Sequence, residues 1–301
     1  MRAVVGPGGF GAILNPLVGS RRRAEDCPPY LRRSAEKPLG APAVFGLRLA
    51  IRGGTTNFHP AKAALMQTRV VQPELLDSLP PEAPEAVASR RDLRRINWFM
   101  GNGRLIGREL LRRRHLPGNS TPLGETTIAE LGAGDGTMLL KILRSQARDW
   151  HGGRIFLVDR QPVVTSETLD GFRRLGWQVD IVADDVFTWL RNAPMTDMMA
   201  TNLFLHHFEG PALGELLRLI GGRTRAFVAC EPRRSAFALL GCRMLRLIGC
   251  NHVTRHDAVV SVRAGFQGTE LGELFRSGTK TAWTIREAAA GPFSHLFVAT
   301  R

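Results

Sequence analysis

The sequence predicts a doubly wound α/β fold, in which helices cover both faces of a mostly parallel sheet. From residue 126 to the C-terminus, short apolar runs of strand length alternate with segments of helical periodicity. A glycine-rich turn follows the first of these runs, at Gly132-Ala133-Gly134-Asp135-Gly136. This order is typical of a strand that passes through a tight turn into a helix.

The first unit combines a strand at residues 126–131, the glycine turn and an apolar helix that starts near Gly136. Glycines permit positive φ angles and let the backbone lie against a ligand. The N-terminus of the following helix presents N–H groups without helical partners. The pattern departs from the G-x-G-x-x-G dinucleotide fingerprint, because Thr137 stands at the last glycine position.

The next two strands are expected at residues 154–159 and 177–182, and both lead into acids. Asp159 follows Gly132 at close to the spacing at which an acid can accept both hydroxyls of a ribose. The alternative is a strand-end aspartate that caps the next helix. Asp184 and Asp185 follow the third strand, where the alternative is a surface acid pair at a helix start.

The fourth strand and its exit, residues 198–208, carry Asn202 and the pair His206-His207. Ligands of open α/β sheets collect at the carboxyl ends of the strands, and a histidine there can accept a proton. Packing and turn formation are an equally open explanation for both histidines. A metal pair is not expected, because adjacent residues do not face one site without a third ligand.

The C-terminal part is expected to contain a helix, a fifth strand and a closing hairpin. An apolar helical segment at residues 237–248 either belongs to the core or walls a pocket for an apolar substrate. Two alternating segments then join through Gly291-Pro292, which indicates two antiparallel strands. These elements are expected at residues 211–220, 223–231, 280–287 and 295–299.

The string from Glu130 to Gly136 resembles the first motif of class I S-adenosylmethionine-dependent methyltransferases, an acid and an apolar residue before G-x-G-x-G. The resemblance covers about residues 66–301. The segment with His206 and His207 resembles that of small-molecule methyltransferases such as those of quinone biosynthesis. The resemblance implies a Rossmann-like sandwich with an antiparallel C-terminal hairpin and an N-terminal helical cap.

The resemblance also implies S-adenosyl-L-methionine as the cofactor. Gly132, Gly134 and Gly136 would let the backbone approach its amino-acid end, and Glu130 would hold its amino group. Asp159 would take the ribose hydroxyls, while Asp185 would accept from the adenine amino group. Asn202 is counted with this cofactor-binding set, and His206 and His207 are the candidate catalytic residues.

The domain organisation follows from composition. Residues 1–65 are rich in Gly, Pro and Arg without a lasting period, and are expected to be a disordered extension. Residues 66–125 are expected to form a linker and the helical cap, with a Pro/Glu/Ala linker at 78–89 and Ser89 capping a helix from Arg90. Residues 126–301 form the predicted catalytic domain. Met66 begins a stretch that resembles the start of related bacterial methyltransferases.

The net charge of +14 is uneven, because residues 1–65 hold ten Lys or Arg and three Asp or Glu. The remainder is mildly basic for its length, so nucleic acid is not expected as a partner. The four cysteines show no C-x-x-C pair, which favours a reduced, cytoplasmic setting. No apolar run has the length of a membrane span. The oligomeric state stays open, with a homodimer among the options.

Two functions remain from the sequence. The first is methyl transfer to a small, apolar phenolic or quinone-like acceptor, which the apolar segment at 237–248 and the two histidines favour. The second is an RNA or protein methyltransferase that uses the basic N-terminal half. No N-P-P-Y motif, often used for base-amine methylation, follows the fourth strand, where Asn202-Leu203-Phe204-Leu205 stands.

A chain that begins at Met66 should keep the melting temperature and the cofactor affinity of the full chain. The reason is that residues 1–65 lack the apolar periodicity needed to join a core. Thermal melts followed by circular dichroism, with and without S-adenosylmethionine, measure both quantities. A lower melting temperature for the shortened chain would show that the extension packs on the fold.

Overall fold

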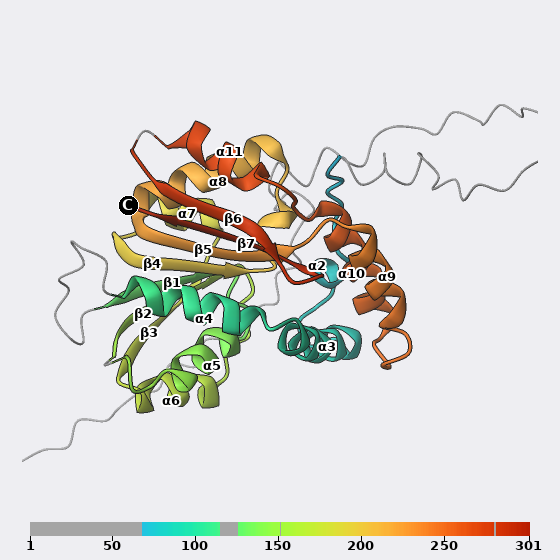
Figure 1. The fold of residues 1–301 in the computed structure, drawn as a ribbon. Helices are drawn as coiled ribbons and strands as arrows, with labels where there is room; N and C mark the ends of the chain where they lie inside the picture. Colours follow the sequence, from blue (N-terminus) through green and yellow to red (C-terminus); the bar gives the residue numbers. More distant parts are fainter. Residues whose placement is uncertain (1–67, 115–125, 151, 280) are drawn as a thin grey trace, which may run out of the picture. The chain divides into compact units, whose positions relative to one another are not determined.

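The computed structural model describes residues 68–114, 126–150, 152–279 and 281–301. They build a seven-stranded sheet with the order β3-β2-β1-β4-β5-β7-β6 (Figure 1). Neighbours among β1–β5 pair in parallel, whereas β7 runs antiparallel to both β5 and β6. The strands are β1 (Thr127–Leu131), β2 (Gly153–Asp159), β3 (Trp177–Ala183), β4 (Thr196–Asn202), β5 (Thr224–Pro232), β6 (Thr284–Ala290) and β7 (Ser294–Thr300).

Helices cover both faces of the sheet, so the predicted doubly wound class and its C-terminal hairpin are confirmed. α4, α5 and α6 lie on one face, and α7, α8 and α11 lie on the other (Figure 1). The helices are α2 (Leu75–Ser78), α3 (Pro84–Met100), α4 (Asn102–Arg113), α5 (Thr137–Ser145), α6 (Ser166–Arg174), α7 (Val186–Asn192), α8 (Gly210–Arg223), α9 (Ala236–Met244), α10 (His252–Ala264) and α11 (Glu270–Gly278). The expected extension at residues 1–65 lies outside the described residues.

One hydrophobic core cluster lies between the sheet and α4 and α5. Ile106 and Leu110 of α4 join Ile128 of β1 and Leu157 of β2 in one buried cluster. Each of these side chains is fully buried, and burial of a large aliphatic side chain contributes about 1.5–3 kcal/mol. The second helix of the predicted cap is therefore held by the same apolar packing as the sheet.

Helix α3 begins earlier than the sequence pattern indicates. It starts at Pro84, a residue suited to the first helical turn because it lacks an N–H that would need a partner there. Ser89 is therefore inside the helix, not its cap, and its hydroxyl lies 2.8 Å from the Thr254 hydroxyl of α10. The predicted linker at 78–89 is wrong from residue 84 onwards, because polar contacts with α10 hold this segment in a helix.

Four helices gather beyond the carboxyl ends of the central strands. α10 contacts α2, α3 and α9, and these four lie together past the tip of β4 (Figure 1). α9 is shorter than the predicted apolar segment, and it leaves Phe237, Leu240 and Met244 more than half exposed. Among the described helices, none has the length and apolarity required to cross a membrane.

The side chain of Asn102 ties α4 to two strand ends. Its amide nitrogen donates to the side-chain oxygen of Asn202 at the end of β4, at 2.8 Å, and to that of Asn97 in α3, at 3.3 Å. Its own oxygen accepts from the Ser294 hydroxyl of β7 at 2.7 Å. Asn102 is fully buried, so every one of these polar atoms depends on its partners.

Replacing Asn102 with Leu should lower the free energy of unfolding by roughly 2–4 kcal/mol. The substitution keeps the approximate volume but leaves Asn202 and Ser294 without this partner, and each buried polar group left unsatisfied costs about 1–3 kcal/mol. Urea denaturation followed by fluorescence measures the change. The exposed Asn192→Leu at the end of α7 is the control and should change stability by less than about 0.5 kcal/mol. Equal effects of both substitutions would contradict a structural role for this amide network.

Candidate functional site

The glycine turn after β1 is the first part of the site. Gly132, Gly134 and Gly136 have φ angles of 67°, 54° and 66°, which lie in the left-handed region that glycine tolerates best. The N–H groups of Gly132 and Ala133 both donate to the carbonyl oxygen of Val158 at the end of β2. The turn is therefore fixed against the neighbouring strand.

The three glycines differ in what surrounds them. A Cβ on Gly132 would stand 2.4 Å from the ring of Phe204, and one on Gly136 would stand 2.9 Å from Leu157. At Gly134, no atom of the described residues other than Gly134 and its two chain neighbours lies within 4 Å of the place a Cβ would take. Gly132 and Gly136 thus serve internal packing, while Gly134 borders open space.

Asp159 reaches this turn from the end of β2. One of its carboxylate oxygens accepts from the N–H of Gly134 at 2.9 Å, and the other accepts from the N–H of Gln161 at 2.8 Å. Each carboxylate oxygen can accept a second hydrogen bond. The structure therefore brings the acid and the glycine turn together, and the ribose role of Asp159 stays a prediction.

Glu130 lies beneath the turn, near the end of β1. It is almost completely buried, and within the described part of the chain its Oε2 has no hydrogen-bond partner. Burial raises the pKa of Glu130 well above its usual value, and the nearby carboxylates of Asp135 and Asp159 add to this rise. A hydrogen bond with the Leu139 backbone opposes it. An unpartnered buried carboxyl oxygen is costly unless a donor or a cation reaches it.

Asp185 caps the helix after β3. Its Oδ1 accepts from the N–H groups of Phe187 at 2.9 Å and Thr188 at 3.3 Å. Asp185 therefore stands at a helix start, the position named in the sequence alternative of a surface acid pair. Register places it close to the other acid, because Ala183 pairs with Asp159. Its role toward an adenine stays a prediction, with Oδ2 as the second oxygen of the carboxylate.

Asn202 holds the cap helices in place. Its oxygen accepts from Asn102, and its amide nitrogen donates to the side-chain oxygen of Asn97 at 3.2 Å. These bonds give the residue a structural role at the end of β4. Its membership of the cofactor-binding set stays a prediction.

The chain turns sharply after β4. Leu203 has a φ of 52°, an uncommon angle for a residue with a branched side chain. The ring of Phe204 then covers Gly132, and the 3₁₀ turn η3 (Leu205–His207) follows. The residue whose ring packs on the glycine turn thus directly precedes the turn that carries the two histidines.

Glu231 at the end of β5 fixes this turn. Its fully buried carboxylate accepts from the backbone N–H groups of Phe204, Leu205 and His206, at 2.9–3.3 Å. It also bonds Nδ1 of His206 at 2.9 Å. Glu231 is the last residue of the strand expected at 223–231, and the sequence gives no sign of these four contacts.

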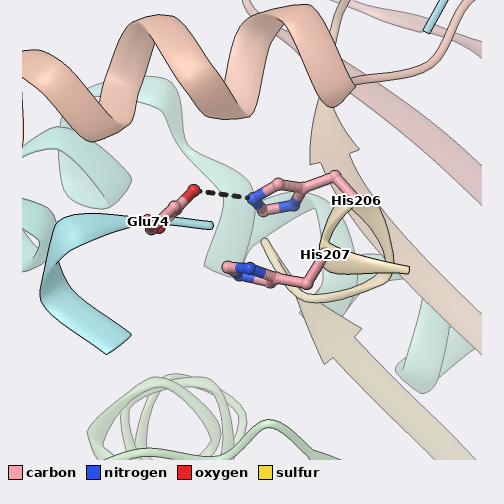
Figure 2. A group of neighbouring side chains, drawn as sticks. All are labelled: Glu74, His206 and His207. Atoms are coloured by element: carbon pink, nitrogen blue, oxygen red, sulfur yellow. Dashed lines mark hydrogen bonds and ion pairs between the residues drawn. The ribbon is translucent and has the colours of Figure 1, made fainter. Parts of the chain in front are cut away.

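His206 lies between two carboxylates. Its Nε2 lies 3.2 Å from Oε1 of Glu74, a residue that precedes α2 (Figure 2). Burial lowers the pKa of His206, but the bonds to Glu231 and Glu74 outweigh this and raise the pKa to about 9. Burial raises the pKa of Glu74, whereas His207, His206 and Ser261 lower it to about 2. Both ring nitrogens of His206 are therefore engaged by carboxylates.

His207 is the more accessible histidine, with about a quarter of its side chain exposed. Its ring lies 4.3 Å from that of His206 and 6.5 Å from that of Phe204, measured between centroids. Its Nδ1 lies 3.5 Å from Oδ2 of Asp77 in α2. The two candidate histidines therefore have different environments, and His207 is the one that solvent reaches.

The segment before α2 completes the site, and sequence reasoning missed it. Arg69 donates to the carbonyl oxygens of His206 and Phe208, and to that of Ala264 at the end of α10. Its guanidinium also stacks over the ring of Phe266, 4.3 Å from the centroid. The sequence carries no motif that links Arg69 or Glu74 to residues more than 130 positions later.

Comparisons with known proteins concern the fold. No family model matches the chain, and no curated protein matches it either. The structure of the plantazolicin methyltransferase BpumL in complex with SAH is similar, with a TM-score of 0.50 and 12% identity, over 73% of this chain and 91% of BpumL. The plantazolicin methyltransferase BamL, in complex with a triazolic desmethylPZN analog and SAH, has a TM-score of 0.50 and 10% identity, over 75% of this chain and 92% of BamL. The chain has the fold of the class I methyltransferases.

Proposed function

We propose that the chain transfers a methyl group from S-adenosylmethionine to a small apolar acceptor. The observation that carries the proposal is the glycine turn, where Gly134 borders open space and Asp159 lies against its N–H. This turn stands at the carboxyl end of β1, the edge where open α/β sheets bind ligands. The SAH bound to BpumL and BamL is the product that S-adenosylmethionine leaves after methyl transfer.

The residues around the turn fit this cofactor. Its ammonium group would give the unpartnered Oε2 of Glu130 a donor and a positive charge, which opposes the effect of burial on that carboxyl. The space over Gly134 would admit its amino-acid end. Asp159 would hold the ribose hydroxyls, and Asp185 the adenine amino group. The cofactor would supply an electrophilic methyl group on a sulfonium.

The chain itself would contribute positioning and a proton acceptor. Holding donor and acceptor in line is the main catalytic contribution expected for a methyl displacement. His206 is ion-paired on both ring nitrogens, so its role is to orient the turn. His207 is partly exposed and near Phe204, which makes it the candidate to take a proton from an acceptor hydroxyl.

The apolar surface beyond the strand ends favours an apolar acceptor. Phe293 of the β6–β7 turn lies between Phe99 of α3 and Phe237 of α9 in an aromatic row. Its ring centroid is 6.4 Å from that of Phe99 and 5.6 Å from that of Phe237. Phe99 and Phe237 are largely exposed, as are Leu240 and Met244. Exposed apolar groups that gather in one place indicate a binding surface.

The arginines at the end of α4 give less support to a nucleic-acid acceptor. Arg112 and Arg113 both bond the buried carboxylate of Glu109, and Arg286 of β6 pairs with the same group. These charges stabilise an internal acid, so they contribute less to a basic surface than their number in the sequence suggests. An RNA acceptor remains an outcome that experiment can distinguish.

Gly134→Ala should weaken S-adenosylmethionine binding at least tenfold. The added methyl enters space that the proposal gives to the cofactor, and it meets no protein atom there. Asp159→Ala should weaken binding by about 1–3 kcal/mol through loss of charged hydrogen bonds. Titration calorimetry measures both.

Gly268→Ala is the matched control for the glycine substitution. Gly268 has a similar φ of 59° and equally open surroundings, so the two variants carry similar backbone strain. Its affinity for the cofactor should equal that of the original chain. Binding of NAD without binding of S-adenosylmethionine would refute the proposed function.

Leu240→Asp should lower turnover of apolar phenols and quinols, because it places a charge on the apolar surface of α9. His207→Ala should lower turnover while changing cofactor affinity little. A methyl-transfer assay with labelled cofactor gives the rates, and Ile181→Asp on the exposed edge strand β3 is the control.

For an RNA acceptor, binding would instead fall with salt at a log–log slope of about −0.7 for each phosphate neutralised. Salt-sensitive methylation of RNA, with no turnover of phenols, would overturn the apolar acceptor.

A further inference from the structure

Three side chains with metal-binding atoms converge beside the 3₁₀ turn. Glu74 comes from the segment before α2, and His206 and His207 come from η3 (Figure 2). One donor atom from each of the three lies within 4.8 Å of the others. The sequence argument against a metal site was the lack of a third ligand for the adjacent histidines, and Glu74 removes that objection.

Glu231 gives His206 the orientation that metal-bound histidines have. It engages Nδ1, and this leaves Nε2 directed at Glu74. In metal sites, a ligating histidine almost always uses its second ring nitrogen to donate to a carboxylate, a carbonyl or water, which fixes the tautomer and the ring plane. The carboxylate of Glu231 is itself held by backbone N–H groups, so the imidazole is rigidly placed.

The spacing of the His206–Glu74 donor pair also suits a small cation. Nε2 of His206 and Oε1 of Glu74 are 3.2 Å apart. Two ligands about 2.0–2.1 Å from a tetrahedral zinc ion stand roughly 3.3 Å from each other. The Ser261 hydroxyl donates to the same Oε1 of Glu74 and thereby anchors the carboxylate from α10.

One side of the cluster is open. His206 and Glu74 are nearly buried, whereas His207 is partly exposed and its neighbour Asp77 is mostly exposed. Three protein ligands with one accessible position are the arrangement of catalytic zinc sites, in contrast to the closed four-ligand sites that serve structure. Asp77 lies 3.5 Å from Nδ1 of His207, where it can orient that ring as Glu231 orients the other.

We propose that Glu74, His206 and His207 form a divalent-metal site of the zinc class, with one open coordination position. Two imidazoles and one carboxylate suit zinc and its substitute cobalt, while magnesium and calcium prefer sites made of oxygen ligands. The site goes beyond the proposed methyl transfer, which requires no metal. Because a metal-bound His207 cannot also accept a proton, occupancy of the site would decide which chemistry is available there.

Metal titration of the full-length protein tests the proposal without a turnover assay. The protein is first stripped with a chelator and dialysed, then titrated with Zn²⁺ by calorimetry and with Co²⁺ by visible absorption. The expected result is the binding of one equivalent of Zn²⁺ and an intense visible absorption typical of Co²⁺ with four or five ligands. An excess of Mg²⁺ should not displace either ion. A cobalt spectrum that matches the hexa-aquo ion would overturn the proposal.

Variants assign the binding to these residues. His207→Ala should lower Zn²⁺ affinity at least tenfold, and this partly exposed position is the least apt to disturb folding. Glu74→Gln should lower the affinity by a similar factor. His252→Ala is the matched control, an exposed histidine at the start of α10 outside the cluster, and it should bind Zn²⁺ like the original chain.

Two further measurements separate the possible failures. Thermal melts of each variant without metal show whether folding is intact, and added Zn²⁺ should raise the melting temperature of the original chain and of His252→Ala but not of His207→Ala. Zn²⁺ binding that is unchanged in His207→Ala would refute the site. S-adenosylmethionine titrations of the same samples report on the proposed function independently, since its contacts lie at the glycine turn.

Discussion

The carboxylate of Glu231 is the constraint on which the candidate site depends. It stands at the end of β5, fully buried, and accepts hydrogen bonds from three successive backbone N–H groups and one imidazole nitrogen. A buried carboxylate is costly unless its lone pairs are filled, and here four donors fill them. The chain after β4 is thereby held in the sharp turn that places Phe204 over Gly132 and brings His206 and His207 together.

The three glycines of the turn meet two different requirements, close packing within the protein and space beside the backbone for a ligand. Phe204 requires a glycine at position 132, and Leu157 favours one at position 136, for reasons that lie within the protein. Gly134 differs, because nothing in the described chain fills the volume beside it. A repeated glycine pattern can therefore combine two requirements, one met by the fold itself and one that an external molecule would have to meet.

The elements predicted well from the sequence are those that depend on local patterns. Apolar runs in the sequence predicted the strands. Asp159 lies at the glycine turn because parallel strands end at a common edge of the sheet. The start of α3 was missed because Ser89 is a good helix cap by type, and its actual partner, Thr254, is distant in sequence. The same limit applies to Glu74 and to the ion pair of Glu109 with Arg286, which depend on residues brought together only by the fold. Nothing in the sequence likewise indicated that the side chain of Asn202 forms hydrogen bonds with α3 and α4.

The segment that carries Arg69 and Glu74 also affects the order in which the molecule can assemble during synthesis. Arg69 bonds a carbonyl 195 residues later, and Glu74 bonds a hydroxyl 187 residues later. On the ribosome, this segment emerges early, and its bonds to η3 and α10 can form only after those later elements have been made. Closing so long a loop carries an entropic cost that only late contacts can offset. The parallel strands β1 to β5 can pair before α10 is made, so the bonds that fix this early segment to α10 are completed late.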